Sequence, residues 1–262
     1  MIGILGGMGP LATLDFFSKV LAATPASEDA DHVPLLIQSD PRIPSRPAAI
    51  VGNGVPPLPE LIVARDRLVA AGSKALAMPC NTAHFWFSDL VEACPVPFIS
   101  IVDACTSELS SMLRTGGTVG LIATRATLTG KIFDAPIRKA GYHLQSPDDE
   151  SMSQLVLPGI ELVKAGQISE AGPLIEQAVQ RLLENGADTV VLACTETPVA
   201  LDAVASPLRF KCVDSTAALA RACVAWWTAN WGVELKGWRQ LPLAKYSGED
   251  GLSPDVSCGN LN

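Results

Sequence analysis

Two cysteines stand in contexts that suit chemistry. Cys80 lies in the segment MPCNT, after the apolar run 75–78, and Cys194 lies in LACTE, after the run 189–193. Ligands of open α/β sheets bind beyond the carboxyl ends of the strands, so both thiols are expected where reactions take place. Backbone N–H groups at the helix start after such a strand hold carboxylates and favour a thiolate.

Two acid–base groups on opposite faces of one carbon invert its configuration, because one removes the α-proton and the other returns a proton. A free thiol has a pKa of about 8.5, so local charge can make one thiol a thiolate while the other stays protonated. The carbanion then needs donors that stabilise charge on the carboxylate, and Asn81, Thr82 and Thr195 are suitable. The pair Cys80 and Cys194 is therefore the predicted catalytic pair.

Elements that alternate along the chain must position these thiols. Short apolar runs predict buried parallel strands, and amphipathic stretches at 59–71 and 173–185 predict helices that stop at Gly72 and Gly186. A late helix is expected over 215–231, with Ser215 or Thr216 near its N-cap. The predicted strands lie at 2–5, 34–38, 75–78, 98–101, 118–123 and 189–193.

The chain also repeats itself. Segment 61–82 resembles 174–196, and a weaker echo links 2–13 with 119–129. Cys194 lies 114 residues after Cys80, and position 119 lies 117 residues after position 2, so both echoes have nearly the same offset. We therefore expect an α/β fold of two similar, pseudo-symmetric domains, each a mainly parallel sheet flanked by helices. The predicted domains are 1–103 plus 208–262 and 104–207, with the active site in the cleft between them.

The composition of the chain restricts its binding partners, its location and its metal and disulfide content. The 262 residues carry a formal net charge of −8, which disfavours nucleic acids and anionic membrane surfaces. No apolar run is long enough for a membrane span, and the opening residues lack the basic leader of a signal peptide, so a cytoplasmic protein is expected. Seven cysteines without a CxxC pair argue against a disulfide framework, and three scattered histidines argue against a metal site. Five cysteines are interpreted as structural: Cys94, Cys105, Cys212, Cys223 and Cys258.

Several motifs together carry a family resemblance. They are GGMGP with AT at 6–13, PRIPSR at 41–46, MPCNTAH at 78–84, GLIAT at 120–124 and CTETP at 194–198. On these motifs, which span nearly the whole chain in order, the sequence resembles the aspartate/glutamate racemase superfamily, and more closely its aspartate racemase branch. Glu196 stands where glutamate racemases generally have His, which favours that branch.

The resemblance implies a cofactor-independent (PLP-independent) two-base thiol racemase and frequent homodimers. Its substrate would be a small acidic amino acid, aspartate or glutamate. Position by position, it implies that Asn81, Thr82, Thr124 and Thr195 hold the α-carboxylate side, that Arg46 and Lys164 reach the distal carboxylate, and that Met8 and Glu196 complete the substrate-binding set. An Arg fork binds a carboxylate bidentately and supplies the local attraction that an anionic substrate needs in an acidic protein.

Other interpretations stay open. The same superfamily includes isomerases and decarboxylases that act on small dicarboxylates through a Cys nucleophile. A function without catalysis, as an amino-acid sensor or a thiol redox switch, is a further hypothesis. A dinucleotide site is disfavoured, because GILGGMGP is not GxGxxG. His84 follows Cys80 by four residues. It either adjusts the pKa of the Cys80 thiol or has only a structural role, in helix capping and packing.

Overall fold

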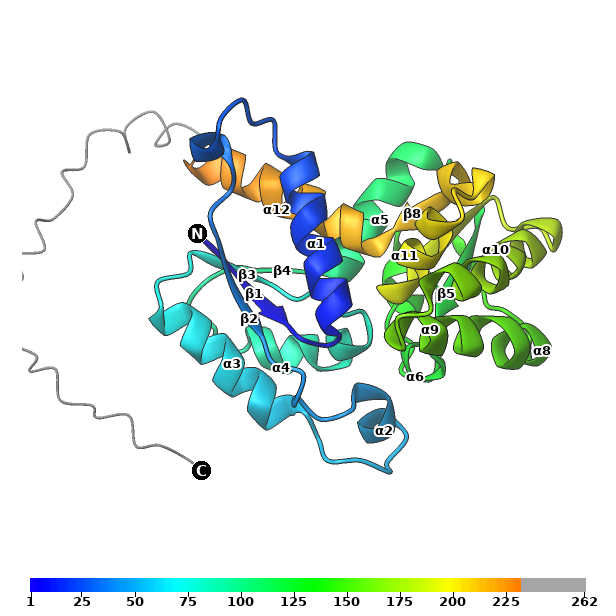
Figure 1. Ribbon diagram of the computed structural model, residues 1–262, viewed down its shortest axis with the longest axis horizontal. Helices are drawn as coiled ribbons and strands as arrows, with labels where there is room; N and C mark the ends of the chain where they lie inside the picture. Colours follow the sequence, from blue (N-terminus) through cyan, green and yellow to red (C-terminus); the bar gives the residue numbers. More distant parts are fainter. Residues whose placement is uncertain (232–262) are drawn as a thin grey trace, which may run out of the picture.

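Two parallel sheets with the same strand order form the molecule. The structure, a computed structural model, describes residues 1–231. The sheets have the orders β2-β1-β3-β4 and β6-β5-β7-β8, every pairing is parallel, and helices flank both (Figure 1). We call the parts around them the first unit and the second unit. The irregular tail predicted after Lys236 and the cysteine Cys258 lie outside the described residues.

The first unit contains the elements β1 to β4, and α5 leads out of it. In chain order these are β1 (Ile2–Gly6), α1 (Pro10–Ala23), the short 3-10 helix η1 (Asp29–Asp31), β2 (Leu35–Ser39), α2 (Arg46–Ile50), α3 (Leu58–Ala70), β3 (Ala75–Ala77), the 3-10 helix η2 (Thr82–Trp86), α4 (Phe87–Val91), β4 (Phe98–Ile99) and α5 (Ile101–Met112).

The second unit contains β5 to β8, and α12 closes the described chain. In order these are β5 (Thr118–Ala123), α6 (Arg125–Thr129), α7 (Asp134–Lys139), β6 (His143–Gln145), α8 (Asp149–Ser151), the π-helix η3 (Met152–Val156), α9 (Leu157–Lys164), α10 (Ile168–Glu184), β7 (Thr189–Ala193), α11 (Glu196–Ala203), the 3-10 helix η4 (Pro207–Lys211), β8 (Cys212–Asp214) and α12 (Ser215–Trp231). None of the helices within residues 1–231 is long and apolar enough to cross a membrane.

The strand register reproduces the two offsets that the sequence repeat predicted. Ile2 pairs with Ala75 in the first sheet, and Val119 pairs with Thr189 in the second. Val119 lies 117 residues after Ile2, and Thr189 lies 114 residues after Ala75. The two units are therefore equivalent strand by strand, and the predicted α/β fold of two similar units is confirmed.

The central strands of both sheets are buried on both faces, whereas β2 and β4 at the sheet edges are only half-buried. β1 and β7 are buried along their whole length, as expected of strands covered by helices on both sides. The helices α3 and α10 end before Gly72 and Gly186, whose φ angles of +91° and +97° lie in the left-handed region that favours glycine.

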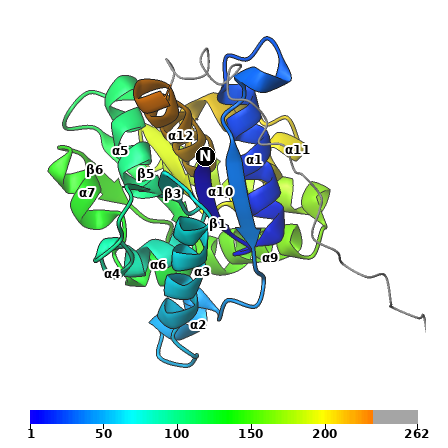
Figure 2. The ribbon, with the colours of Figure 1, turned by 90° about the vertical axis from the view of Figure 1, so that its left-hand side faces the viewer.

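One apolar core runs through both units. It contains Phe16 and Ile101 from the first unit's helices, Leu121 from β5, and Trp227 from α12. Helix α12 packs against both α1 and α5, and α1 and α12 lie side by side in the two views (Figures 1 and 2). The late helix thus returns to the first unit, as predicted.

Three features differ from the sequence prediction. Strands β6 and β8 were not predicted, and β8 pairs with β7 although 208–262 was assigned to the first unit; the other domain boundaries stay a prediction. Helix α10 begins at Ile168 and runs through Pro173, so its start lies before the predicted one. The N-cap of α12 is Asp214, because its Oδ1 accepts from the backbone N–H groups of the second and third helix residues at 2.9 and 3.0 Å.

Candidate active site

The carboxyl ends of four strands carry most of the predicted catalytic and binding residues, while Arg46 comes from α2 and Lys164 from the end of α9. Met8 follows β1, Cys80 follows β3, Thr124 follows β5 and Cys194 follows β7. A fifth residue, Ser215, comes directly after β8. This edge is where open α/β sheets bind ligands. The region is closed, since each of the two thiols has an exposure of 5%.

Cys80 lies beside a cation. Burial raises the pKa of the Cys80 thiol, while the Arg46 guanidinium, through its charge and a hydrogen bond, and the Ala83 backbone N–H lower it. The carboxylate of Glu196 acts in the opposite direction on the same thiol. Arg46 is therefore the group that favours a thiolate at Cys80.

Arg46 is fixed by backbone carbonyls. Its Nη1 donates to the carbonyl oxygens of Ile43 and Pro44 at 2.9 and 3.0 Å, and its Nη2 donates to that of Met8 at 3.3 Å. A guanidinium has five N–H donors, so three are occupied by these carbonyls. Its Nε is buried and has no hydrogen-bond partner among the described residues. The side chain is thus held in place with donor capacity to spare.

Cys194 lies beside an anion. Its Sγ donates to Glu196 Oε2 at 3.0 Å, and Thr195 Oγ1 donates to the same oxygen at 3.2 Å. Burial, followed by the charge and hydrogen bond of Glu196, raises the pKa of the Cys194 thiol well above its ordinary value. Lys164 opposes this shift through its charge. Lys164 is exposed at the end of α9, so it reaches the site only electrostatically in this structure.

The two thiols therefore have opposite electrostatic surroundings. A guanidinium stands next to Cys80, and a carboxylate accepts a hydrogen bond from Cys194. Glu196 raises the pKa of both thiols, so one carboxylate is close enough to act on each. Burial raises the pKa of both thiols, but less at Cys80, beside the cation, than at Cys194, beside the anion, so Cys80 is the more readily ionised of the two.

Three threonine hydroxyls join the two units. Thr82 Oγ1 lies 3.2 Å from Thr124 Oγ1 and 2.9 Å from Thr127 Oγ1, and the latter two lie 3.0 Å apart. Thr124 also caps α6 by accepting from the Thr127 backbone N–H. The sequence did not predict Thr127 as part of the site, although it stands three residues after Thr124, the usual spacing of a cap.

Asn81 is anchored from the far end of the chain. Its Nδ2 donates to Ser215 Oγ at 2.9 Å, and its Oδ1 is buried without a hydrogen-bond partner among the described residues. Ser215 had been interpreted only as a helix cap.

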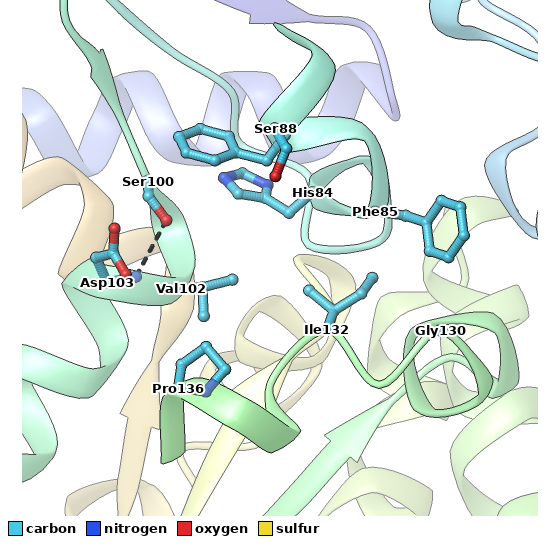
Figure 3. A pocket seen from close by; sticks show the side chains of 10 residues that line it. His84, Phe85, Ser88, Ser100, Val102, Asp103, Gly130, Ile132 and Pro136 are labelled. Atoms are coloured by element: carbon cyan, nitrogen blue, oxygen red, sulfur yellow. Dashed lines mark hydrogen bonds between the residues drawn. The ribbon is translucent and has the colours of Figure 1, made fainter. Parts of the chain in front are cut away.

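His84 braces the loop that carries Cys80. Its Nδ1 donates to the Cys80 carbonyl at 2.9 Å, and its Nε2 accepts from the Ile101 N–H at 3.1 Å. Burial lowers the pKa of His84 to about 4, so the ring is neutral at pH 7. His84 thus caps α5 and packs. A pocket lies behind it, with His84 on one side and Ile132 and Pro136 of the second unit on the other (Figure 3).

The other cysteines of residues 1–231 are free and most are buried. Cys105 and Cys223 lie in the shared core. Cys212 Sγ donates to the Leu208 carbonyl, and burial raises the pKa of this thiol to about 12. Within the same residues, no group of three His, Cys, Asp or Glu side chains is placed to hold a metal ion.

Comparison with known proteins gives the family. The model of the Asp/Glu/hydantoin racemase family matches residues 5–223. The chain is 27% identical over 244 residues to the broad specificity amino-acid racemase RacX of Bacillus subtilis, which covers 87% of this chain and 99% of that protein. It is 30% identical over 230 residues to a glutamate racemase of Deinococcus radiodurans, which covers 84% of this chain and 72% of that protein.

Solved structures of racemases have the same fold as this chain. The aspartate racemase of Picrophilus torridus is 32% identical, has a TM-score of 0.75, and covers 86% of this chain and 93% of its own. A glutamate racemase from Francisella tularensis, 19% identical with a TM-score of 0.63, shares the fold. Fold and matched motifs define a two-unit α/β isomerase. The chain belongs to the Asp/Glu/hydantoin racemase family.

Proposed function

We propose that this protein is a PLP-independent racemase of an acidic amino acid, in which Cys80 and Cys194 are the two bases. The observation that carries the proposal is the pairing of buried thiols at equivalent strand ends with opposite partners, Arg46 at one and Glu196 at the other. A two-base reaction needs one thiolate and one thiol at the start, and this asymmetry makes Cys80 the thiol that loses its proton more readily, although burial raises the pKa of both.

The reaction balances without another reactant. The Cys80 thiolate takes the α-proton from one face, and the C–H electron pair moves into the α-carboxylate as an enediolate-like state. The Cys194 thiol gives its proton to the opposite face and becomes a thiolate. In the reverse direction the roles are exchanged. Hydroxyl groups of Thr82, Thr124 and Thr195 are the donors that we assign to the carboxylate, which requires the threonine cluster to rearrange when substrate enters.

An acidic substrate is favoured by the spare donor capacity of Arg46. Its buried Nε has no partner within residues 1–231, and a carboxylate beyond the α-carbon would satisfy it. Relatives are named as aspartate, glutamate and broad specificity amino-acid racemases, so aspartate and glutamate are the first acids to test. The cytoplasmic location expected from the sequence stays a proposal, as does the homodimer that the family resemblance implies; sedimentation of the purified protein tests the dimer.

The burial of the two thiols argues against a redox switch. Redox-sensing cysteines are exposed and have a lowered pKa. Both thiols here are 5% exposed, and burial raises the pKa of each.

The test is incubation with L-aspartate or L-glutamate in D2O, without cofactor, followed by NMR of the α-proton and by optical rotation. We expect loss of both signals with the unmodified protein, and no racemisation after Cys80→Ser or Cys194→Ser. Cys212→Ser is the matched control, because that thiol is buried outside the site and a hydroxyl can keep its bond to Leu208. Racemisation that survives both site substitutions would contradict the two-thiol mechanism.

A further inference from the structure

One buried hydroxyl joins the two cysteine segments. Ser215 Oγ accepts from Asn81 Nδ2 at 2.9 Å and donates to the Leu192 carbonyl at 2.8 Å. Asn81 directly follows Cys80, and Leu192 stands two residues before Cys194. Ser215 has no exposed surface. It therefore ties the end of β7 to the loop after β3, across the boundary between the units.

Counting donors fixes the direction of the Asn81 amide. A serine hydroxyl has one hydrogen to donate, and here it goes to the Leu192 carbonyl. The Ser215 oxygen can then only accept from Asn81. A flipped amide would place Asn81 Oδ1 against another acceptor, so the NH2 group must face Ser215 and the carbonyl oxygen must face away from it.

The Asn81 oxygen that this orientation presents is an unused acceptor. Asn81 is 2% exposed, and its Oδ1 has no hydrogen-bond partner within residues 1–231. Leaving a buried acceptor unpaired is costly, so the position suits a ligand that brings a donor. An amino-acid substrate brings one strong donor, its α-ammonium group, whereas its carboxylates are acceptors and cannot satisfy this oxygen.

We propose that Ser215 is a positioning residue that turns the Asn81 carbonyl oxygen toward the α-ammonium group of the substrate. This rests on the proposed function, and it assigns Asn81 to the ammonium in place of the α-carboxylate side that the resemblance implies. Ser215 selects amino acids over dicarboxylates without an ammonium group.

The start of α12 is held rigidly enough to do this. Asp214 accepts from two backbone N–H groups of the helix and forms ion pairs with Lys19 and Arg209. Because Asp214, the preceding residue, is fixed by these bonds, the backbone of residue 215 has little freedom to shift when the Ser215 hydroxyl is removed.

The experiment compares two ligands that differ in the ammonium group. Calorimetry measures the Kd of racemic aspartate, which undergoes no net reaction, and of succinate, for full-length protein with and without Ser215→Ala. We expect the Kd of aspartate to rise by about 10-fold or more, the size of a lost hydrogen bond to a charged group, and the Kd of succinate to change by less than about 3-fold. Ser215→Thr should restore the aspartate affinity.

The matched control is Thr216→Val. Thr216 is the next residue of the same helix, and its buried hydroxyl has no hydrogen-bond partner in the described part of the chain, so removing it should change neither Kd. If Ser215→Ala fails to fold, Asn81→Asp gives the opposite sign: a carboxylate keeps an acceptor for the ammonium group but repels succinate, so succinate should weaken more than aspartate.

Equal weakening of both ligands by Ser215→Ala, or no change in either, would overturn the positioning role. Wild-type protein that binds aspartate but racemises neither aspartate nor glutamate would contradict the proposed function, while the ratio of the two Kd values would still decide the role of Ser215. Binding of succinate but not of aspartate by the wild-type protein would overturn the inference outright.

Discussion

Replacing Arg46 by glutamine should separate its charge from its packing. The substitution removes the cation beside Cys80 and donors to the carbonyls of Ile43, Pro44 and Met8. Burial already raises the pKa of Cys80, and Arg46 opposes that shift. Without the cation the pKa rises further, so less thiolate is present at any given pH below it.

The size of the effect follows from the interaction lost. A hydrogen bond to a charged group contributes about 1.5–3 kcal/mol, which corresponds to a decrease of roughly 10- to 150-fold in the thiolate fraction. We expect kcat/KM in the direction that starts from the Cys80 thiolate to fall by about that factor at neutral pH. The rising limb of its pH profile should move to higher pH.

The assay is the initial rate of racemisation, measured for each enantiomer across the pH range that the protein tolerates. The pH dependence of kcat/KM reports the ionising groups of the free enzyme. Arg46→Lys is the matched variant, because it keeps the charge and loses the fork, and its limb should shift less than that of Arg46→Gln. A rising limb of Arg46→Gln that coincides with the wild-type limb would refute the role of Arg46 in ionising Cys80.

Three further substitutions test other parts of the account. Glu196→Gln removes the charge that raises the pKa of Cys194, so alkylation of that thiol by iodoacetamide, followed by mass spectrometry, should begin at lower pH than in the wild type; an unchanged onset would count against the assigned pairing. Thr127→Val removes a hydroxyl of the threonine cluster, and the free energy of urea unfolding should fall by about 1–3 kcal/mol. Asp214→Asn should cost about 1.5–3 kcal/mol of stability at pH 7, because it removes the buried carboxylate that Lys19 and Arg209 share, while Asp15 and Asp202 still pair with these two cations. Burial opposes ionisation of Asp214, but its cationic partners lower the pKa below the ordinary value of 3.8, so its stabilisation is present above that value and is lost as the pH falls. The gap between this variant and the wild type should therefore narrow in acid, and a gap independent of pH would contradict the ion-pair reasoning.

Long apolar elements could be predicted from the sequence. Strands β1 and β7 are buried throughout and β5 is buried after its first residue, so their apolar runs were sufficient to predict them, and the sequence repeat predicted the equivalence of the two sheets. The glycines after α3 and α10 marked the helix ends correctly, because their positive φ angles are a local requirement.

Short and long-range features could not be predicted. Strands β6 (HLQ) and β8 (CVD) have three residues each and, unlike the equally short β3, belong to no apolar run; they pair with the edges of β5 and β7. Helix α10 runs through Pro173, whereas the helix was expected only over the amphipathic stretch 173–185.

The sequence predicted the residues of the candidate site but not the contacts between them. The thiols stood out by their motifs, but the partner of Asn81 is Ser215, separated by 134 residues, and no local pattern links them. Glu196 was assigned to substrate binding from the resemblance, whereas the structure shows that its carboxylate accepts a hydrogen bond from the Cys194 thiol. This contact could not be predicted, because it depends on the distance between the two side chains.

The most direct test of the central claim is the location of deuterium early in the reaction. L-aspartate, or L-glutamate if that acid is preferred, is incubated with the protein in D2O, and both enantiomers are isolated after a small fraction of turnover. Two thiols on opposite faces predict that the D-product carries deuterium delivered by the thiol opposite the one that removed the proton. The remaining L-substrate should keep its proton early in the reaction, because the deuterated thiol lies on the other face. Equal deuterium in both enantiomers from the start, with each site cysteine dispensable, would contradict the two-base account.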